Sequence, residues 1–96
     1  MKIPKKIKVG AYTYKVKFCP KVSHEGKSLT GLCDNENFEI TLEKGLSGPE
    51  LKVVFLHECL HAIEYCYEIK LGEKRVSKLD HAIVAFITDN KVKFNG

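Results

Sequence analysis

Apolar and polar residues alternate along the first part of the chain, a pattern typical of β-strands with one buried face. The alternation covers residues 6–9 and 12–18, where tyrosine, valine and phenylalanine interleave with threonine and lysine. Gly10 and Ala11 separate the two runs and predict a hairpin turn. We therefore expect a first antiparallel strand pair here.

A second strand pair is predicted at residues 28–34 and 38–42. The turn-forming run Asp34-Asn35-Glu36-Asn37 separates these two segments. In the later segment Phe38, Ile40 and Leu42 point to one face, and Glu39, Thr41 and Glu43 point to the other. Residues 20–27, between the two pairs, are expected to form a loop.

The second half of the chain predicts two helices. Ser47 and Glu50 have the spacing of a capping box, with Pro49 in the first turn, and the run to about Tyr67 is apolar on most sides. We expect this helix to be largely buried. A second helix is expected from near Glu73 to about Asp89, with apolar residues three and four apart, and Asn90 is expected to end it in the left-handed conformation.

Strands followed by helices indicate an α+β fold in which two helices pack on a small antiparallel sheet of about four strands. The 96 residues suit a single domain over residues 1–96.

The sequence His57-Glu58-Cys59-Leu60-His61 is the motif that indicates chemistry. Histidines four apart lie one turn above each other on a helix, so both imidazoles can bind one cation, for which Zn²⁺ is well suited. Glu58 is rotated by about 100° from His57 and is placed to act as general base toward a zinc-activated water. Two histidines and a carboxylate inside an apolar helix are costly without partners, which favours a metal site over a purely structural role.

A tetrahedral zinc site also needs a third protein ligand, which we expect from the second helix. Glu73 extends the inward stripe of that helix and is the favoured ligand, with Asp80 and His81 as alternatives. If Glu73 binds the metal, Asp80 becomes a candidate to orient a histidine N–H, or alternatively a boundary residue in contact with solvent. Tyr65, Tyr67 and His24 are weaker candidates for stabilising an oxyanion.

These motifs resemble the small zinc peptidases of the minigluzincin kind, which are related to ImmA/IrrE-type peptidase domains and to short bacteriophage proteins. The resemblance rests on residues 54–63 (VFLHECLHAI), on residues 73–80 (EKRVSKLD) with Ile83 and Val84, and on Gly31, Ile40 and the pair Asp89-Asn90. It implies a gluzincin-like core: a sheet whose edge strand holds an extended peptide, an active-site helix, and a second helix whose glutamate, Glu73 here, binds zinc.

Composition and charge bear on where in the cell the protein is expected and on which class of partner it binds. The net charge is +4, from 16 basic and 12 acidic residues, and Arg75 is the only arginine, which does not favour nucleic-acid binding. No secretory signal or membrane span is evident, so we expect a cytoplasmic protein. The resemblance implies that its setting is a bacterium or a phage-infected host cell. The four cysteines contain no C-x-x-C pair and are expected to be buried, reduced thiols, with Cys59 and Cys66 on a core face of the first helix.

The leading hypothesis is a zinc metallopeptidase acting on a peptide or protein substrate. The substrate would add as a strand beside residues 38–42 or 28–32. The alternative is a catalytically silent, zinc-stabilised binding module that acts through a protein partner in phage or bacterial regulation. A retained Glu58 favours catalysis, because a structural zinc site needs no general base.

Overall fold

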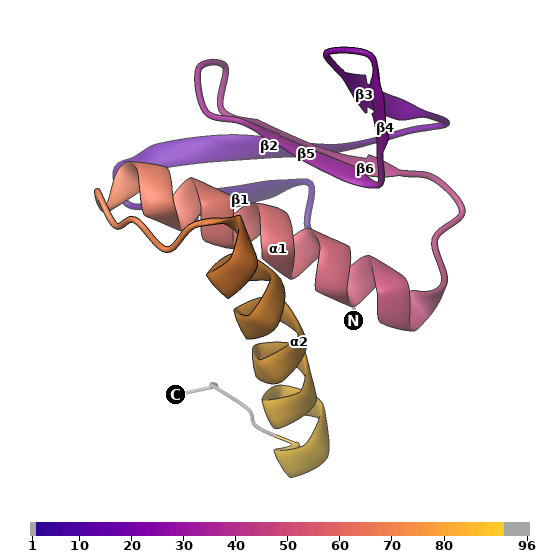
Figure 1. The fold of residues 1–96 in the computed structure, drawn as a ribbon, viewed down its shortest axis with the longest axis vertical. Helices are drawn as coiled ribbons and strands as arrows, with labels where there is room; N and C mark the ends of the chain where they lie inside the picture. The colour runs from indigo at the N-terminus through magenta and orange to yellow at the C-terminus, as the bar shows by residue number, and fades with distance from the viewer. Residues whose placement is uncertain (1, 92–96) are drawn as a thin grey trace.

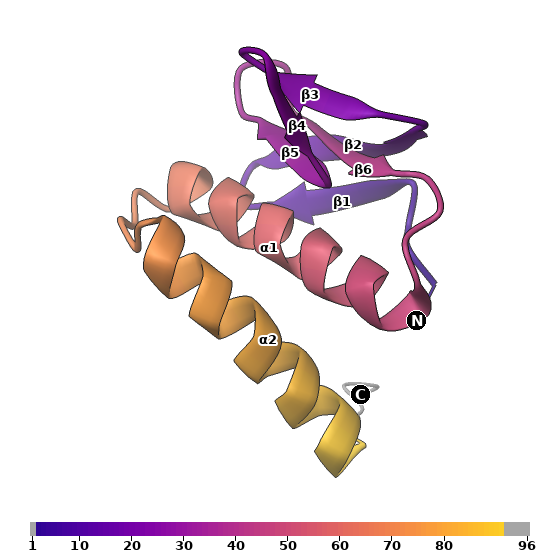
Figure 2. The same cartoon turned by 45° about the vertical axis from the view of Figure 1, so that its right-hand side comes forward.

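A computed structural model describes residues 2–91 and places them in three layers: a sheet, one helix across its face, and a second helix packed on the first (Figure 1). Figure 2 shows the same layers from another side, with α1 between the strands and α2. The elements are β1 (Lys6–Val9), β2 (Tyr12–Cys19), β3 (Val22–His24), β4 (Lys27–Leu29), β5 (Gly31–Asp34), β6 (Glu39–Glu43), α1 (Gly48–Cys66) and α2 (Glu73–Asn90). The predicted α+β class is confirmed.

The main sheet has four strands in the order β1-β2-β6-β5. The predicted hairpin of β1 and β2 is confirmed, with Val9 paired to Tyr12 across a turn in which Gly10 has a φ of +59°. The predicted pair of β5 and β6 is also present, although β5 begins at Gly31 rather than at Ser28. One pairing differs from the expected antiparallel sheet, since β6 lies parallel to β2. Strand alternation fixes which face is buried but not which strand is the neighbour, so the sequence could not reveal this parallel pair.

The predicted loop at residues 20–27 was wrong, because this segment contributes to a separate two-stranded sheet of β3 and β4. The two strands are three residues each, and Ser23 pairs with Ser28. Glu25 and Gly26 between them both have positive φ, at 50° and 78°, as tight hairpins require. Polar strands this short have no hydrophobic alternation, which explains why the pattern did not indicate them.

The core lies between the four-stranded sheet and α1. Its buried members are Val9, Tyr14, Val16, Ile40, Leu42 and Ala62. Ile40 and Leu42 thus share one face, as predicted, and that face is buried. Phe38 lies just before β6 with a φ of 55° and packs against Tyr12 and Tyr14, with ring centroids 4.5 and 5.4 Å away.

Helix α1 begins as predicted, since the Ser47 hydroxyl accepts a hydrogen bond from the Glu50 amide at 3.3 Å. The expectation that α1 is largely buried was wrong: only Glu58, Leu60 and Ala62 are buried, and most of its other residues are half-buried. Three of the four strands in the sheet have only four or five residues, so the sheet covers only part of the 19-residue helix. Helix α2 has its predicted extent, but Lys91 rather than Asn90 adopts the left-handed conformation at its end. Within residues 2–91, no helix is long and apolar enough to cross a membrane.

Candidate metal centre

Three predicted ligands converge between the two helices. His57 and His61 lie one turn apart on α1, and Glu73 is the first residue of α2. One Glu73 carboxylate oxygen lies 2.8 Å from His57 Nε2, and the other lies 2.9 Å from His61 Nε2. The ligand atoms of these three residues all lie within 4.8 Å of one another, so the group can hold a metal ion.

The other nitrogen of each imidazole is held by a carboxylate. His57 Nδ1 lies 2.7 Å from Asp80 Oδ2, and His61 Nδ1 lies 2.7 Å from Glu64 Oε1. A carboxylate accepts, so in each neutral imidazole Nδ1 carries the proton and Nε2 presents a lone pair. Such carboxylate–histidine pairs fix the tautomer that a metal ligand needs and raise its basicity.

The two Nε2 atoms are only 3.1 Å apart. With both Nδ1 atoms protonated, two nitrogen lone pairs and the Glu73 carboxylate point toward one small volume, and none of the three groups supplies a proton. A proton on one Nε2 would give an ion pair with Glu73 but leave the lone pair of the other Nε2 against the second Glu73 oxygen, and protons on both would place two positive rings in contact. A shared cation removes this conflict, and Zn–ligand bonds of about 2.0–2.2 Å place the ligand atoms of a tetrahedral site roughly 3.3 Å apart, similar to the spacing here.

The Asp80 carboxylate is held by contacts with two histidines and is shielded from solvent. It is 2% exposed, so the alternative of a boundary residue in contact with water was wrong. Its carboxylate reaches both His57 Nδ1 and His81 Nδ1. His81 lies outside the ligand group, on an exposed part of α2, where its ring also contacts the Ser77 carbonyl oxygen at 3.1 Å. The structure thus places Glu73, rather than Asp80 or His81, beside the two histidine Nε2 atoms.

Glu64 has a role that the sequence analysis missed. One of its oxygens holds His61, and the other accepts hydrogen bonds from the amides of Leu71 and Gly72 at 2.8 and 3.1 Å. These amides lie just before Glu73, so a single carboxylate links the orientation of His61 to the position of the third ligand. These bonds and His61 outweigh desolvation and lower the Glu64 pKa. The sequence did contain a signal for this contact: Glu64 lies three residues after His61, and side chains three apart on a helix are neighbours.

Glu58 lies on the side of α1 that faces β5. It is 7% exposed, and a Cβ atom built on Gly31 would lie 3.1 Å from both its Cγ and its Oε2. Burial raises the pKa of Glu58 above its usual value; Glu73 and Asp80 act in the same direction, while His57 and His61 oppose it. A buried carboxylate with a raised pKa beside convergent ligands is an arrangement found in general bases.

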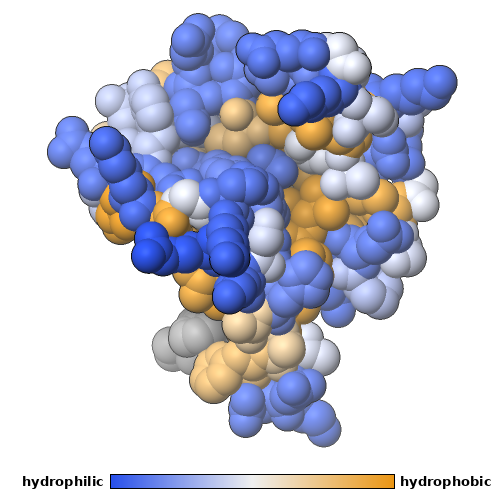
Figure 3. Space-filling view, viewed as in Figure 1, coloured by the Kyte–Doolittle hydropathy of each residue, from blue (hydrophilic) through white to orange (hydrophobic). Residues whose placement is uncertain are grey.

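A cleft of about 770 Å³ connects these groups to the surface. It lies between the β5 segment and the two helices, and both Glu58 and the three convergent ligands line it. Its walls also contain apolar side chains, among them Leu29, Val53 and Ile69. Figure 3 shows apolar surface between the strands at the top of the molecule and the helices below.

β5 is the edge strand of the main sheet on this side. The Glu43 amide donates to the Thr30 carbonyl at 2.9 Å, and the pairing continues with Gly31 opposite Leu42. Bonded and non-bonded pairs alternate along an antiparallel ladder, so Gly31 and Cys33 direct their main-chain groups away from β6. By contrast, β6 is flanked by β2 and β5, so residues 38–42 have no free edge for an added strand.

A buried polar network fixes a further cleft residue, Asn35. The hydroxyl of Tyr14, a fully buried side chain, donates to Asn35 Oδ1 at 2.7 Å, and the Cys33 thiol donates to the same oxygen at 3.3 Å. Burial, together with Cys66, raises the Tyr14 pKa, so its hydroxyl stays protonated. The sequence analysis treated Asn35 only as a turn residue, because its partner Tyr14 is 21 positions away.

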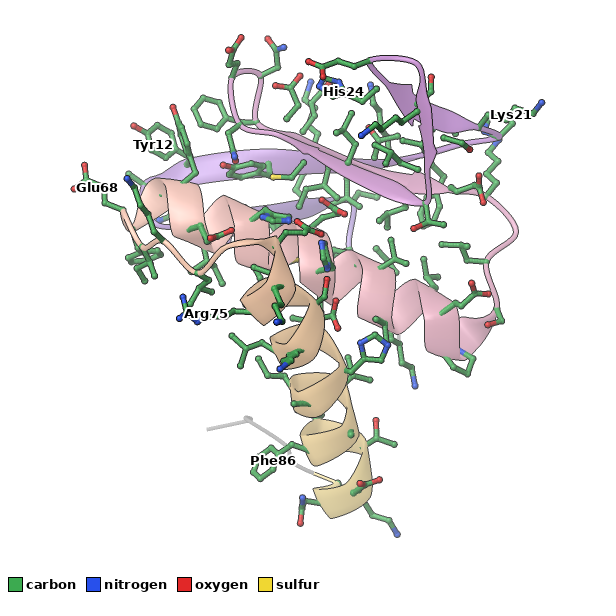
Figure 4. The ribbon with its side chains drawn as sticks, viewed as in Figure 1. Tyr12, Lys21, His24, Glu68, Arg75 and Phe86 are labelled. Atoms are coloured by element: carbon green, nitrogen blue, oxygen red, sulfur yellow. The ribbon has the colours of Figure 1, made fainter. Side chains whose placement is uncertain are left out.

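The remaining predicted residues are dispersed. Tyr65 lines the cleft, whereas His24 lies on β3, away from the helices (Figure 4). Tyr67 caps the end of α1 and is 58% exposed. All four cysteines are free and half-buried rather than fully buried. Cys59 and Cys66 pack against the core, in agreement with the predicted core face of the first helix, and Cys33 on β5 packs there as well.

Comparison of the chain with family models, with curated proteins and with solved structures finds no match. The geometry of the site therefore carries the functional argument.

Proposed function

We propose that this chain is a zinc metallopeptidase, with His57, His61 and Glu73 as zinc ligands and Glu58 as general base. The observation that carries the proposal is the convergence of two histidine lone pairs and one carboxylate beside a buried glutamate. The resemblance of the motifs to minigluzincin and ImmA/IrrE-type domains supports the same assignment.

The donor set favours zinc over harder cations. Two neutral imidazoles and one carboxylate suit Zn²⁺, whereas Mg²⁺ and Ca²⁺ prefer oxygen ligands. Three protein ligands are typical of catalytic zinc sites, in which a fourth position is kept for water or substrate; structural sites usually have four protein ligands. Asp80 and Glu64 then serve to orient the ligands.

Zinc bound here would polarise a peptide carbonyl and lower the pKa of a water molecule. Glu58 accepts a proton from that water as its oxygen attacks the carbonyl carbon. The carbon–nitrogen bond then breaks, and the same carboxylate returns the proton to the leaving amine. The raised pKa of Glu58 suits the first step, because a more basic carboxylate accepts a proton from water more readily than an exposed glutamate does.

The substrate is proposed to be an extended peptide that binds beside β5. Of the two positions expected for an added strand, this is the one at residues 28–32. Gly31 and Cys33 offer outward main-chain donors and acceptors to such a strand. Gly31 also has no side chain to separate the strand from Glu58. Asn35 and Tyr65, which line the same cleft, are available to bind a substrate carbonyl oxygen.

The test is cleavage of a mixed peptide library by the zinc-loaded chain, with products identified by mass spectrometry. Wild type should cleave, and Glu58→Gln should bind zinc equally well but cleave about 10²–10⁴-fold more slowly. Glu68→Gln, an identical change at an exposed residue beyond the end of α1, serves as the control (Figure 4). Normal zinc binding without cleavage of any sequence would instead support the alternative of a zinc-stabilised binding module.

A further inference from the structure

Helix α2 has an exposed stripe that the metal centre does not use. Its members are Arg75, Leu79, Ala82, Phe86 and Asp89, which are spaced alternately four and three residues apart. This spacing keeps them on one side of a helix and is the repeat through which helices pair. Leu79 is 36% exposed and Phe86 is 60% exposed, the highest exposure among the large apolar side chains of the described residues.

The stripe points away from the rest of the molecule. Val76 and Asp80 are buried, and Asp80 reaches His57 on α1, so that side of α2 faces α1. In Figure 1 the second half of α2 projects beyond the sheet, and in Figure 4 the Arg75 and Phe86 side chains extend from the same side of the helix. Apolar surface is visible at this lower end in Figure 3. An exposed apolar stripe of this kind is typical of a protein interface.

The charges at the ends of the stripe identify the partner. Arg75 lies at one end and Asp89 at the other. When two copies of α2 pack antiparallel, Arg75 of each helix lies against Asp89 of the other, and the helix dipoles also oppose each other favourably. A parallel arrangement would place like charges together at both ends. The stripe is therefore complementary to itself about a two-fold axis, as a symmetric dimer interface requires.

We propose that this chain forms a symmetric dimer through antiparallel packing of α2 on α2. Leu79 of one helix lies across from Phe86 of the other, and the small Ala82 at the centre allows the helices to approach closely. Val76 and Asp80 keep their contacts with α1, so the dimer leaves the cleft and its ligands open. This inference does not depend on the proposed peptidase activity.

Sedimentation velocity over a range of concentrations tests the proposal with the full zinc-loaded chain. Wild type should sediment as a dimer, and Phe86→Glu should raise the dimer dissociation constant by at least about 30-fold, because it removes a central aromatic contact. Thr88→Glu places the same charge on another exposed side of α2, away from the stripe and the metal centre, and should leave the dimer intact. A wild-type monomer at chain concentrations up to roughly 1 mM would overturn the proposal, whatever else covers the stripe.

A charge exchange tests the antiparallel arrangement. Arg75→Asp and Asp89→Arg should each weaken the dimer, and the double variant should restore it. Both changes place charges where the helix dipole favours them, an acid near the N-terminus and a base near the C-terminus. Weakening by either single change therefore cannot come from loss of α2, which circular dichroism will verify. A double variant no tighter than the single variants would contradict the antiparallel pairing.

Discussion

At the scale of single residues, the site is built from pairs. Each histidine that faces the metal position has a carboxylate on its other nitrogen: Asp80 for His57, and Glu64 for His61. Burial in this environment acts to lower the His57 pKa, but the hydrogen bond to Asp80 and the nearby carboxylates outweigh it, so the pKa is raised. The imidazole is thus more basic than a free histidine, a property that favours binding to a cation.

The dual contact of Glu64 leads to a specific prediction. Glu64→Gln should weaken zinc binding by about 10–100-fold, because His61 loses its charged acceptor and the segment before Glu73 loses part of its anchor. Competition with a chromophoric chelator measures the affinity. Glu68→Gln, four residues further along and exposed, should leave the affinity unchanged. Equal affinities for wild type and Glu64→Gln would show that the Glu64 contacts do not support the site.

The motif residues were predictable from sequence because their geometry is local. A spacing of four on a capped helix is enough to bring His57 and His61 together, with Glu58 turned toward another side. Glu73 was favoured by its place at the start of the second helix, and it does lie beside the histidines. Asn35 was not predicted as a cleft residue, because a hydrogen bond to Tyr14 depends on strand pairing that no local pattern reveals.

At the scale of elements, the close approach of β5 to α1 positions Glu58. A Cβ atom at Gly31 would lie 2.7 Å from Val54 Cγ1 and 3.1 Å from Glu58 Oε2, so even one methyl group forces a shift. Gly31→Ala should lower the free energy of unfolding by about 1–3 kcal/mol, as expected for overpacking. Urea denaturation of the zinc-loaded protein measures this change.

Gly48→Ala provides the matched control for that substitution. Gly48 is the first residue of α1, and a Cβ there meets nothing within 4 Å. Alanine should be neutral or slightly stabilising, since it restricts the unfolded chain. If both variants unfold at the same urea concentration as wild type, the strand and helix are not held as closely as described.

The elements themselves were largely predictable, but their neighbours were not. Alternation indicated β1, β2 and β6, and capping and periodicity indicated both helices. The parallel pairing of β2 with β6 and the β3–β4 hairpin were not foreseen. Both follow from contacts between segments, which the period of the hydrophobic pattern does not specify.

At the scale of the whole molecule, zinc is expected to contribute to folding. The metal-free chain must hold two imidazoles and a carboxylate together between α1 and α2 without a metal ion. Zinc at about 1,000 times its dissociation constant should stabilise the fold by about 4 kcal/mol. Thermal unfolding should therefore begin at a lower temperature after a chelator is added. His57→Ala should show little difference between the two conditions, and an unchanged wild-type Tm would contradict a stabilising metal.

Calorimetric titration of the metal-free chain with Zn²⁺ tests the central claim most directly. The metal-free chain should saturate at one zinc per chain, lose much of its affinity in Glu73→Ala, and show no specific binding when His57 and His61 are both replaced by alanine. Binding that does not saturate at one equivalent, or that is unchanged in these variants, would contradict the metal centre and with it the proposed function.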